Sequence, residues 1–220
     1  MQVFDYCERM DASFFAEPIN AFSNIFFIMA AYFSYVYLQK SSSKPQTHYS
    51  VQTLNGILVC IGIGSFLWHT FATAWAEFAD VIPITIFIYV YLFAFIRLVL
   101  EKKILVVTAA LIAFTILNYS ITKYADPSLL NGSIAYAPAL FSLLVLAFLA
   151  RKKEKFSFLL LAIFIFLISL LFRSIDFMVC GFLPFGTHFL WHICNAIMLY
   201  MLMVFLMDST SVSDLNKYND

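Results

Sequence analysis

Residues 156–172 read FSFLLLAIFIFLISLLF and contain no charged side chain. A helix that crosses the hydrocarbon core of a bilayer needs about 20 mostly apolar residues, with about 17–25 as the usual range. A strand of a membrane barrel would be about 9–11 residues long and would alternate in polarity, which this stretch does not. A helix also satisfies its own backbone hydrogen bonds within lipid. The stretch therefore predicts a transmembrane α-helix.

The whole chain has the same character. Of its 220 residues, 63% are hydrophobic and 12% are charged, whereas soluble proteins carry about 25% charged residues. This composition excludes a soluble globule, a coiled coil, a disordered chain and a soluble nucleic-acid binder. The formal net charge is zero, so no polyanionic partner is indicated, and no protein partner is inferred. We expect one integral, multi-pass membrane domain over residues 1–220, in a bacterial inner membrane or an endomembrane.

Seven stretches are long and apolar enough to be candidate spans. They predict an all-α, polytopic seven-helix bundle over residues 20–207, with a leader at 1–19 and a short tail at 208–220. No basic segment followed by an apolar core marks a signal peptide, so we expect the leader to remain. The predicted spans are 20–38, 54–71, 80–99, 104–120, 134–149, 156–172 and 187–207.

Basic residues predict the orientation of this bundle, because cytoplasmic loops of membrane proteins are enriched in Lys and Arg. The predicted topology places most of the basic residues on one side, which we take as cytoplasmic, and only Arg9, Lys123 and Arg173 on the other. The leader is then external and the C-terminus cytoplasmic. The residues predicted on the cytoplasmic side are Lys40, Lys44, Arg97, Lys102, Lys103, Arg151, Lys152, Lys153, Lys155 and Lys217.

Polar side chains gather near the outer ends of three predicted spans. The segment GSFLWHTFATAW (64–75) places Ser65 and His69 one helical turn apart, and THFLWHICN (187–195) does the same for His188 and His192. Asp80 opens the third span in ADVIP (79–83). Because the spans run in alternating directions, we expect all five side chains at one depth. Such groups are costly within a membrane, and they usually mark function.

Three imidazoles at one depth predict a zinc site. A catalytic zinc ion is typically held by three protein ligands and keeps a position for water. A single membrane histidine is more often an interhelical hydrogen-bonding residue, but the third histidine and the nearby carboxylate favour His69, His188 and His192 as ligands. Zinc is preferred over copper because no Cys or Met accompanies the imidazoles at the predicted site. Asp80 can accept a proton from the water or orient it, and His48 is assigned to the cytoplasmic loop as a solvated residue.

The predicted outer side contains two further features. Hard oxygen ligands crowd the leader and would suit calcium, although composition alone favours a solvated acidic segment. Cys7 and Cys180 both face the external side and can pair, since that compartment permits disulfides. A polar stripe on the first span serves either helix packing or the site itself. The acidic leader residues are Asp5, Glu8, Asp11 and Glu17, and the stripe is Glu17, Asn20 and Asn24.

The chain resembles the alkaline ceramidase family over nearly its whole length. The resemblance is carried by DYCE (5–8), AEPINAFSN (16–24), GSFLWH (64–69), ADVIP (79–83) and THFLWHICN (187–195). It implies the seven-helix core that the family shares with adiponectin-receptor-like proteins, and zinc held by the three histidines with Ser65 and Asp80 completing the site. It also implies a Cys7–Cys180 disulfide. The implied calcium ligands are Asp5, Glu8, Glu17 and a backbone carbonyl near Tyr6.

These residues predict an intramembrane zinc amidohydrolase that cleaves a ceramide-like N-acyl lipid. Asp80 is the expected general base, and Ser65 is the expected hydrogen-bond donor to the oxyanion. A serine nucleophile is disfavoured because no histidine is free of metal to activate it. The alternative is a seven-helix lipid receptor or sensor with a structural zinc ion, which would need a fourth protein ligand. A transporter is unsupported, since neither a repeated half nor a broken helix is visible.

Overall fold

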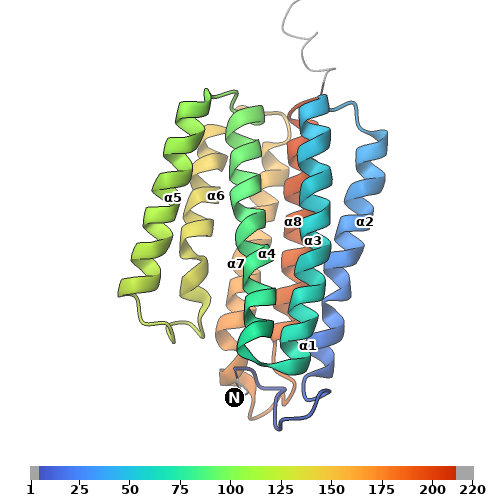
Figure 1. Ribbon diagram of the computed structural model, residues 1–220, viewed down its shortest axis with the longest axis vertical. Coiled ribbons are helices and arrows are strands. Elements are labelled where there is room, and N and C mark those ends of the chain that lie inside the picture. The colour runs from blue at the N-terminus through green and yellow to red at the C-terminus, as the bar shows by residue number, and fades with distance from the viewer. Residues whose placement is uncertain (1–4, 212–220) are drawn as a thin grey trace, which may run out of the picture.

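The protein is all-helical in the computed structural model, which describes residues 5–211. The long helices run in alternating directions along one axis (Figure 1). Within the described residues the β-pairing is confined to an isolated bridge between Ser43 and Ser211. The elements are α1 (Pro18–Ser23), α2 (Ile25–Lys40), α3 (Pro45–Phe71), α4 (Ala74–Ala94), the π-helical η1 (Phe95–Val99), α5 (Ile104–Tyr124), the 3-10 turn η2 (Ser133–Tyr136), α6 (Ala137–Leu149), α7 (Phe156–Val179) and α8 (His188–Asp208).

Six helical segments among the described residues are long and apolar enough to cross a bilayer. The predicted span at 134–149 forms the shorter apolar helix Ser133–Leu149. This pattern supports a multi-pass membrane protein, while seven crossings and their orientation stay predictions. Lys217 and the rest of 212–220 lie outside the described residues. The six long segments are Pro18–Lys40, Pro45–Phe71, Ala74–Val99, Ile104–Tyr124, Phe156–Val179 and His188–Asp208.

Several predicted span boundaries differ from the helix ends, because hydropathy marks the apolar part of a helix and not its ends. Helix α3 begins at Pro45, nine positions before the predicted start, because proline is favoured in a first helical turn and the polar residues after it continue the helix. His48 therefore lies in α3 and not in a loop. Helix α4 begins at Ala74, so Asp80 lies inside this helix and does not open it.

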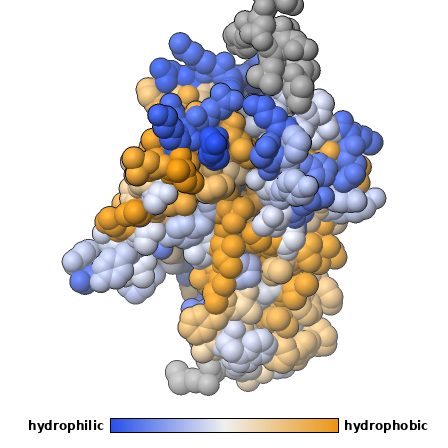
Figure 2. Space-filling view, turned by 45° about the horizontal axis from the view of Figure 1, so that its top comes forward, coloured by the Kyte–Doolittle hydropathy of each residue, from blue (hydrophilic) through white to orange (hydrophobic). Residues whose placement is uncertain are grey.

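The central helices pack most closely. Helix α3 packs on α4 and α2, and α8 packs on α7 and α2, while α5 and α6 form one flank of the bundle (Figure 1). Large apolar side chains cover the outside: Leu105 is 78% exposed and Phe148 is 64% exposed. Figure 2 shows broad hydrophobic areas on one face, with hydrophilic residues concentrated toward one end of the bundle. Such a surface fits lipid contact, because water-soluble monomers rarely expose large apolar patches.

The leader folds across one end of the bundle. A disulfide joins Cys7 to Cys180, 173 positions apart, with their Cα atoms 5.4 Å apart, as the sequence predicts. This end also contains the last turn of α3 and the start of α8, and the described C-terminal residues lie at the other end (Figure 1). The covalent link therefore fixes the leader over the histidine-bearing ends of the helices.

Candidate metal centre

Three buried histidines meet beneath the leader. His69 lies in the last turn of α3, His188 begins α8, and His192 follows one turn later. One ligand atom from each lies within 4.8 Å of the others. All three residues are at most 1% exposed. Among residues 5–211, this is the set of His, Cys, Asp and Glu side chains whose spacing could hold a metal ion.

Two of the histidines are oriented by hydrogen bonds on the ring nitrogen away from the centre. The Nδ1 atom of His69 lies 2.6 Å from Oε2 of Glu17, and Nδ1 of His192 lies 2.7 Å from Oγ of Ser23. The Nε2 atoms of both rings are buried and have no hydrogen-bond partner. Metal-bound histidines commonly use one nitrogen for the metal and donate the other N–H to an oxygen. The ring orientations and the orphaned Nε2 atoms therefore fit a metal ion.

The third histidine is held by aromatic rings. The ring of His188 stacks on Tyr6 at 3.8 Å between centroids and on Trp191 at 5.3 Å. Its Nδ1 atom is buried without a partner. Arg173 donates a hydrogen bond to the Tyr6 hydroxyl at 3.1 Å and lies over the Trp191 ring at 5.4 Å. Arg173 thus contacts both of the rings, Tyr6 and Trp191, that stack on His188.

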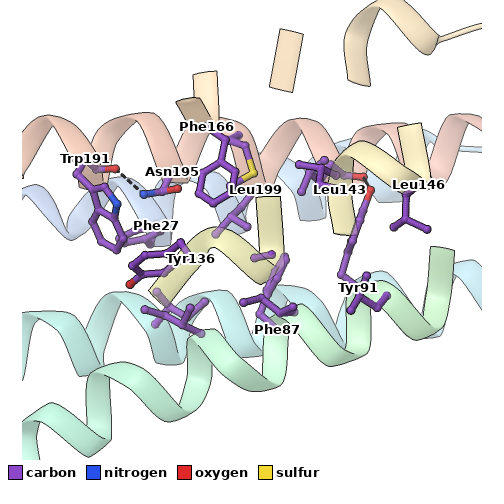
Figure 3. A pocket seen from close by; sticks show the side chains of 17 residues that line it. Phe27, Phe87, Tyr91, Tyr136, Leu143, Leu146, Phe166, Trp191, Asn195 and Leu199 are labelled. Atoms are coloured by element: carbon purple, nitrogen blue, oxygen red, sulfur yellow. Dashed lines mark hydrogen bonds between the residues drawn. The ribbon is translucent and has the colours of Figure 1, made fainter. Parts of the chain in front are cut away.

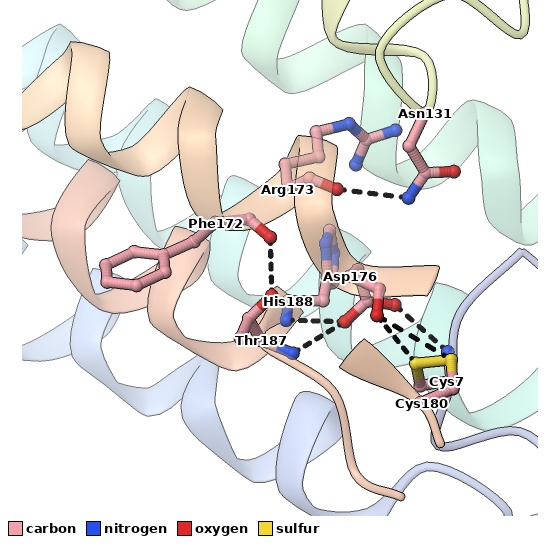
Figure 4. The surroundings of a disulfide bond; sticks show 8 residues. All are labelled: Cys7, Asn131, Phe172, Arg173, Asp176, Cys180, Thr187 and His188. Carbon is pink, nitrogen blue, oxygen red and sulfur yellow. Dashed lines mark hydrogen bonds between the residues drawn. A yellow bond between two sulfur atoms is a disulfide. The ribbon is translucent and has the colours of Figure 1, made fainter. Parts of the chain in front are cut away.

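Asp176 fixes the start of α8, and sequence reasoning missed this role. Its Oδ1 accepts the backbone N–H of Thr187 at 2.6 Å and of His188 at 3.0 Å, and its Oδ2 accepts that of Cys7 at 3.0 Å (Figure 4). A carboxylate is favoured there because unpaired N–H groups and the positive end of the helix dipole meet at a helix N-terminus. The available signal was an acidic residue near the end of the mostly apolar 156–179 segment.

A glycine is required beside this carboxylate. Gly186 has φ +62°, which L side chains rarely adopt. A Cβ atom there would overlap Asp176 and lie 2.8 Å from the Cβ of Cys7. The tight turn before α8 therefore depends on Gly186.

Ser65 and Asp80 meet near His69 across the contact of α3 with α4. A Cβ on Gly64 would lie 2.0 Å from the carbonyl oxygen of Ala79, so only glycine allows the two backbones this close. Asp80 lies within electrostatic reach of His69 and beside Ser65. The Ser65 Oγ and Asp80 Oδ1 atoms are buried and have no other hydrogen-bond partner than, at most, each other's side chain. The structure thus brings an uncommitted carboxylate oxygen and a hydroxyl to the edge of the histidine cluster.

Glu8, Asp11 and Glu17 of the acidic leader bond to protein groups. The Glu8 carboxylate accepts the backbone N–H groups of Ile19 at 2.7 Å and Asn20 at 2.8 Å, at the start of α1. Burial raises the pKa of Glu8, and these two bonds oppose the rise. Burial also raises the pKa of Asp5 and of Tyr6, the latter being the ring stacked on His188. These contacts give calcium no support, and the calcium site at Asp5, Tyr6, Glu8 and Glu17 stays a prediction.

Glu17 belongs to the histidine cluster. Burial opposes its ionisation, but hydrogen bonds from His69 and Arg9 outweigh this effect and lower its pKa. Its Oε2 also accepts the side-chain amide of Asn20 at 3.1 Å. The predicted polar stripe of Glu17, Asn20 and Asn24 is fully buried, and Glu17 connects it to His69.

An apolar cavity lies within the bundle, with one end beside residues that contact the histidines. Phe27, Tyr136, Trp191 and Asn195 line one end, and Tyr91, Leu143 and Leu146 line the other (Figure 3). Trp191 is the residue that stacks on His188, so the cavity begins beside the histidines. Its indole N–H is buried and has no partner. The arrangement offers a long apolar volume with a hydrogen-bond donor at the end nearest the metal centre.

A comparison with protein families shows to which family the chain belongs. The family model described as Ceramidase matches residues 3–219, nearly the whole chain. The chain belongs to the ceramidase family. A search of the curated proteins found no match. Membership in the ceramidase family, together with the long apolar helices, identifies a multi-pass integral membrane protein, and it supports an amidohydrolase function on ceramide.

Proposed function

We propose that this ceramidase-family protein is a zinc-dependent amidohydrolase that cleaves the amide bond of ceramide or a closely similar N-acyl lipid. The observation that carries the proposal is the cluster of three buried histidines, each with an orphaned ring nitrogen, and Asp80 lies within electrostatic reach of His69. The apolar cavity beside them supplies a place for the lipid.

His69, His188 and His192 would hold the metal ion. Three imidazoles suit zinc, and a set of three protein ligands is typical of catalytic zinc sites. When bound, zinc activates water as a nucleophile and polarises the carbonyl group of the substrate. The hydrogen bonds that His69 Nδ1 donates to Glu17 and that His192 Nδ1 donates to Ser23 hold the rings so that their Nε2 atoms face the centre.

Asp80 would serve as the general base and then as the general acid. Its free Oδ1 takes a proton from the water as the water oxygen bonds to the carbonyl carbon. The same oxygen then delivers this proton to the amine nitrogen as the carbon–nitrogen bond breaks. The products are a fatty acid and a free amine, so water and the amide account for every atom.

Ser65 would donate its hydroxyl hydrogen bond to the oxyanion that forms on the former carbonyl oxygen. Its Oγ is free of other partners and lies on the α3 turn that precedes His69. The cavity would take an apolar chain of the lipid, and the indole N–H of Trp191 is free to bind a polar group near the scissile amide.

The number of ligands favours this enzyme over a lipid receptor with structural zinc. Structural zinc sites are almost always closed by four protein ligands. Within residues 5–211, the set of residues that could hold a metal contains three histidines. Asp80 has a free oxygen beside that set, as a proton acceptor requires.

A substrate panel tests the proposal. Purified protein in detergent is incubated with ceramide and other N-acyl lipids, and the released fatty acids are measured by mass spectrometry. We expect release from ceramide, loss of release after metal chelation and recovery when zinc is added. Binding of these lipids without fatty-acid release from any of them would instead support the receptor.

A further inference from the structure

Arg9 is a buried cation in the leader that the proposed mechanism does not use. It is 3% exposed although it lies in the segment that covers the end of the bundle. Its Nε donates to Oε1 of Glu17 at 2.5 Å, and its Nη2 donates to the carbonyl oxygen of His69 at 2.8 Å. Its Nη1 is 3.5 Å from the carbonyl oxygen of Asp11. Arg9 therefore contacts a metal-site histidine directly and also contacts the carboxylate that orients it.

These contacts form a chain that ends at the metal centre. Glu17 is 2% exposed and uses Oε1 for Arg9 and Oε2 for Nδ1 of His69. A buried carboxylate is costly unless it is paired, and removal of one partner of a buried pair leaves the other charge uncompensated. With Arg9 in place, the Glu17 carboxylate is fixed at both oxygens, and His69 presents Nε2 to the centre.

The surroundings of the guanidinium resemble those of a bound cation. One carboxylate oxygen and two backbone carbonyl oxygens surround it. Such oxygen ligands suit a hard cation, and a positive charge is favoured where the carbonyl groups end a helix, as at His69 in the last turn of α3. The Arg9 side chain thus supplies a positive charge that compensates the buried carboxylate of the acidic leader.

We propose that Arg9 is a positioning residue of the metal centre, an internal cation that holds Glu17 and through it the His69 ring, so that zinc binding depends on Arg9 and not on calcium. The inference rests on the proposed three-histidine metal site. The Arg9–Glu17 pair differs from an ordinary surface ion pair because both side chains are buried and because Glu17 also bonds to His69, a proposed zinc ligand.

Zinc affinity of Arg9 variants tests the inference without any assay of turnover. The apparent zinc dissociation constant is measured by chelator competition for the wild type, Arg9→Gln and Arg9→Lys. Loss of a partner that orients a metal ligand typically weakens metal binding about 10–100-fold, which we expect for Arg9→Gln. Arg9→Lys keeps the charge and should recover a large part of the affinity. The matched control is Arg151→Gln, which removes an exposed arginine far along the chain at the end of α6.

The outcomes separate this inference from the proposed function. If the wild type binds no zinc, the three-histidine site itself is wrong. If the wild type binds zinc and Arg9→Gln binds it equally well, or if Gln and Lys weaken it equally, Arg9 does not act by positioning. Added calcium should leave the zinc affinity of the metal-stripped wild type unchanged, and a calcium-dependent increase would contradict the internal-cation role. Should Arg9→Gln fail to fold, Arg9→Lys and the calcium titration still decide the question.

Discussion

At the scale of single residues, Asp80 and Ser65 differ in what their free oxygen atoms can do. Oδ1 of Asp80 can take a proton from water, whereas the Ser65 hydroxyl is not a base at neutral pH and can only form hydrogen bonds. Both atoms are buried beside His69 without other partners. The two side chains should therefore fail in different ways when they are replaced.

Asp80→Asn should retain zinc and lose hydrolysis. The amide keeps the size of the carboxylate, but it cannot take the proton of the water, and general acid–base assistance contributes about 10²–10⁴-fold in rate. Ser65→Ala should be milder, because the metal also stabilises the oxyanion. Fatty-acid release and zinc content, measured on the same preparations, check both statements.

The opposite pattern would reverse the roles. If Asp80→Asn loses its zinc and Ser65→Ala is the inactive variant, Asp80 holds or orients the metal and Ser65 takes part in the reaction. If neither substitution changes turnover, the base lies outside this pair.

At the scale of elements, the contact of α3 with α4 determines whether Ser65 and Asp80 meet. Gly64 allows this contact, since a Cβ would lie 2.0 Å from Ala79 O and 3.2 Å from the Asp80 backbone nitrogen. The neighbouring atoms belong to the backbone of α4, which cannot move aside as the end of a flexible side chain could. The approach of Ser65 to Asp80 therefore depends on the absence of a Cβ atom at Gly64.

Gly64→Ala should destabilise the protein and reduce hydrolysis, because the added methyl group forces α3 and α4 apart. Overpacking of this kind typically costs about 1–3 kcal/mol. Gly56→Ala in the same helix is the matched control, since nothing lies within 4 Å of its added Cβ. Alanine is favoured over glycine in a helix by about 0.5–1 kcal/mol, so the control should be at least as stable as the wild type. Thermal unfolding in detergent measures both, and equal stability of the two variants would contradict the proposed close contact.

The sequence predicts the elements well where a run is long and apolar. The 156–172 stretch lies inside α7, and the spacing of His188 and His192 places both in the first turns of α8. Boundaries are less predictable, because the polar residues after Pro45 continue α3 beyond its apolar part. The 134–149 run is long enough by hydropathy to be proposed as a span, yet it forms a shorter helix.

At the scale of the whole molecule, long-range contacts limit what the sequence can predict. His69, His188 and His192 can be grouped from helix direction and depth alone, and their ligand atoms do meet. The pairing of Asp176 with Cys7 spans 169 positions, and that of Glu17 with His69 spans 52, so neither follows from local spacing. Arg9 counts in the sequence only as one external basic residue, because its burial depends on how the leader folds over α3.

The leader is consequently part of the candidate metal centre. It contributes the Tyr6 ring against His188, Glu17 on His69 and the disulfide to Cys180. These contacts reach two of the three histidines, and the third, His192, is bonded by Ser23 of α1. The central claim is therefore that His69, His188 and His192 together bind one zinc ion.

Zinc content per chain tests this claim most directly. Purified wild-type protein should contain about one tightly bound zinc, the stoichiometry of a single three-histidine site. The His188→Ala, His192→Ala double variant should contain almost none, whereas His48→Ala, which removes the histidine in the first turn of α3, should leave the content unchanged. Elemental analysis of the folded preparations measures all three proteins. Full retention of zinc by the double variant would contradict the assignment.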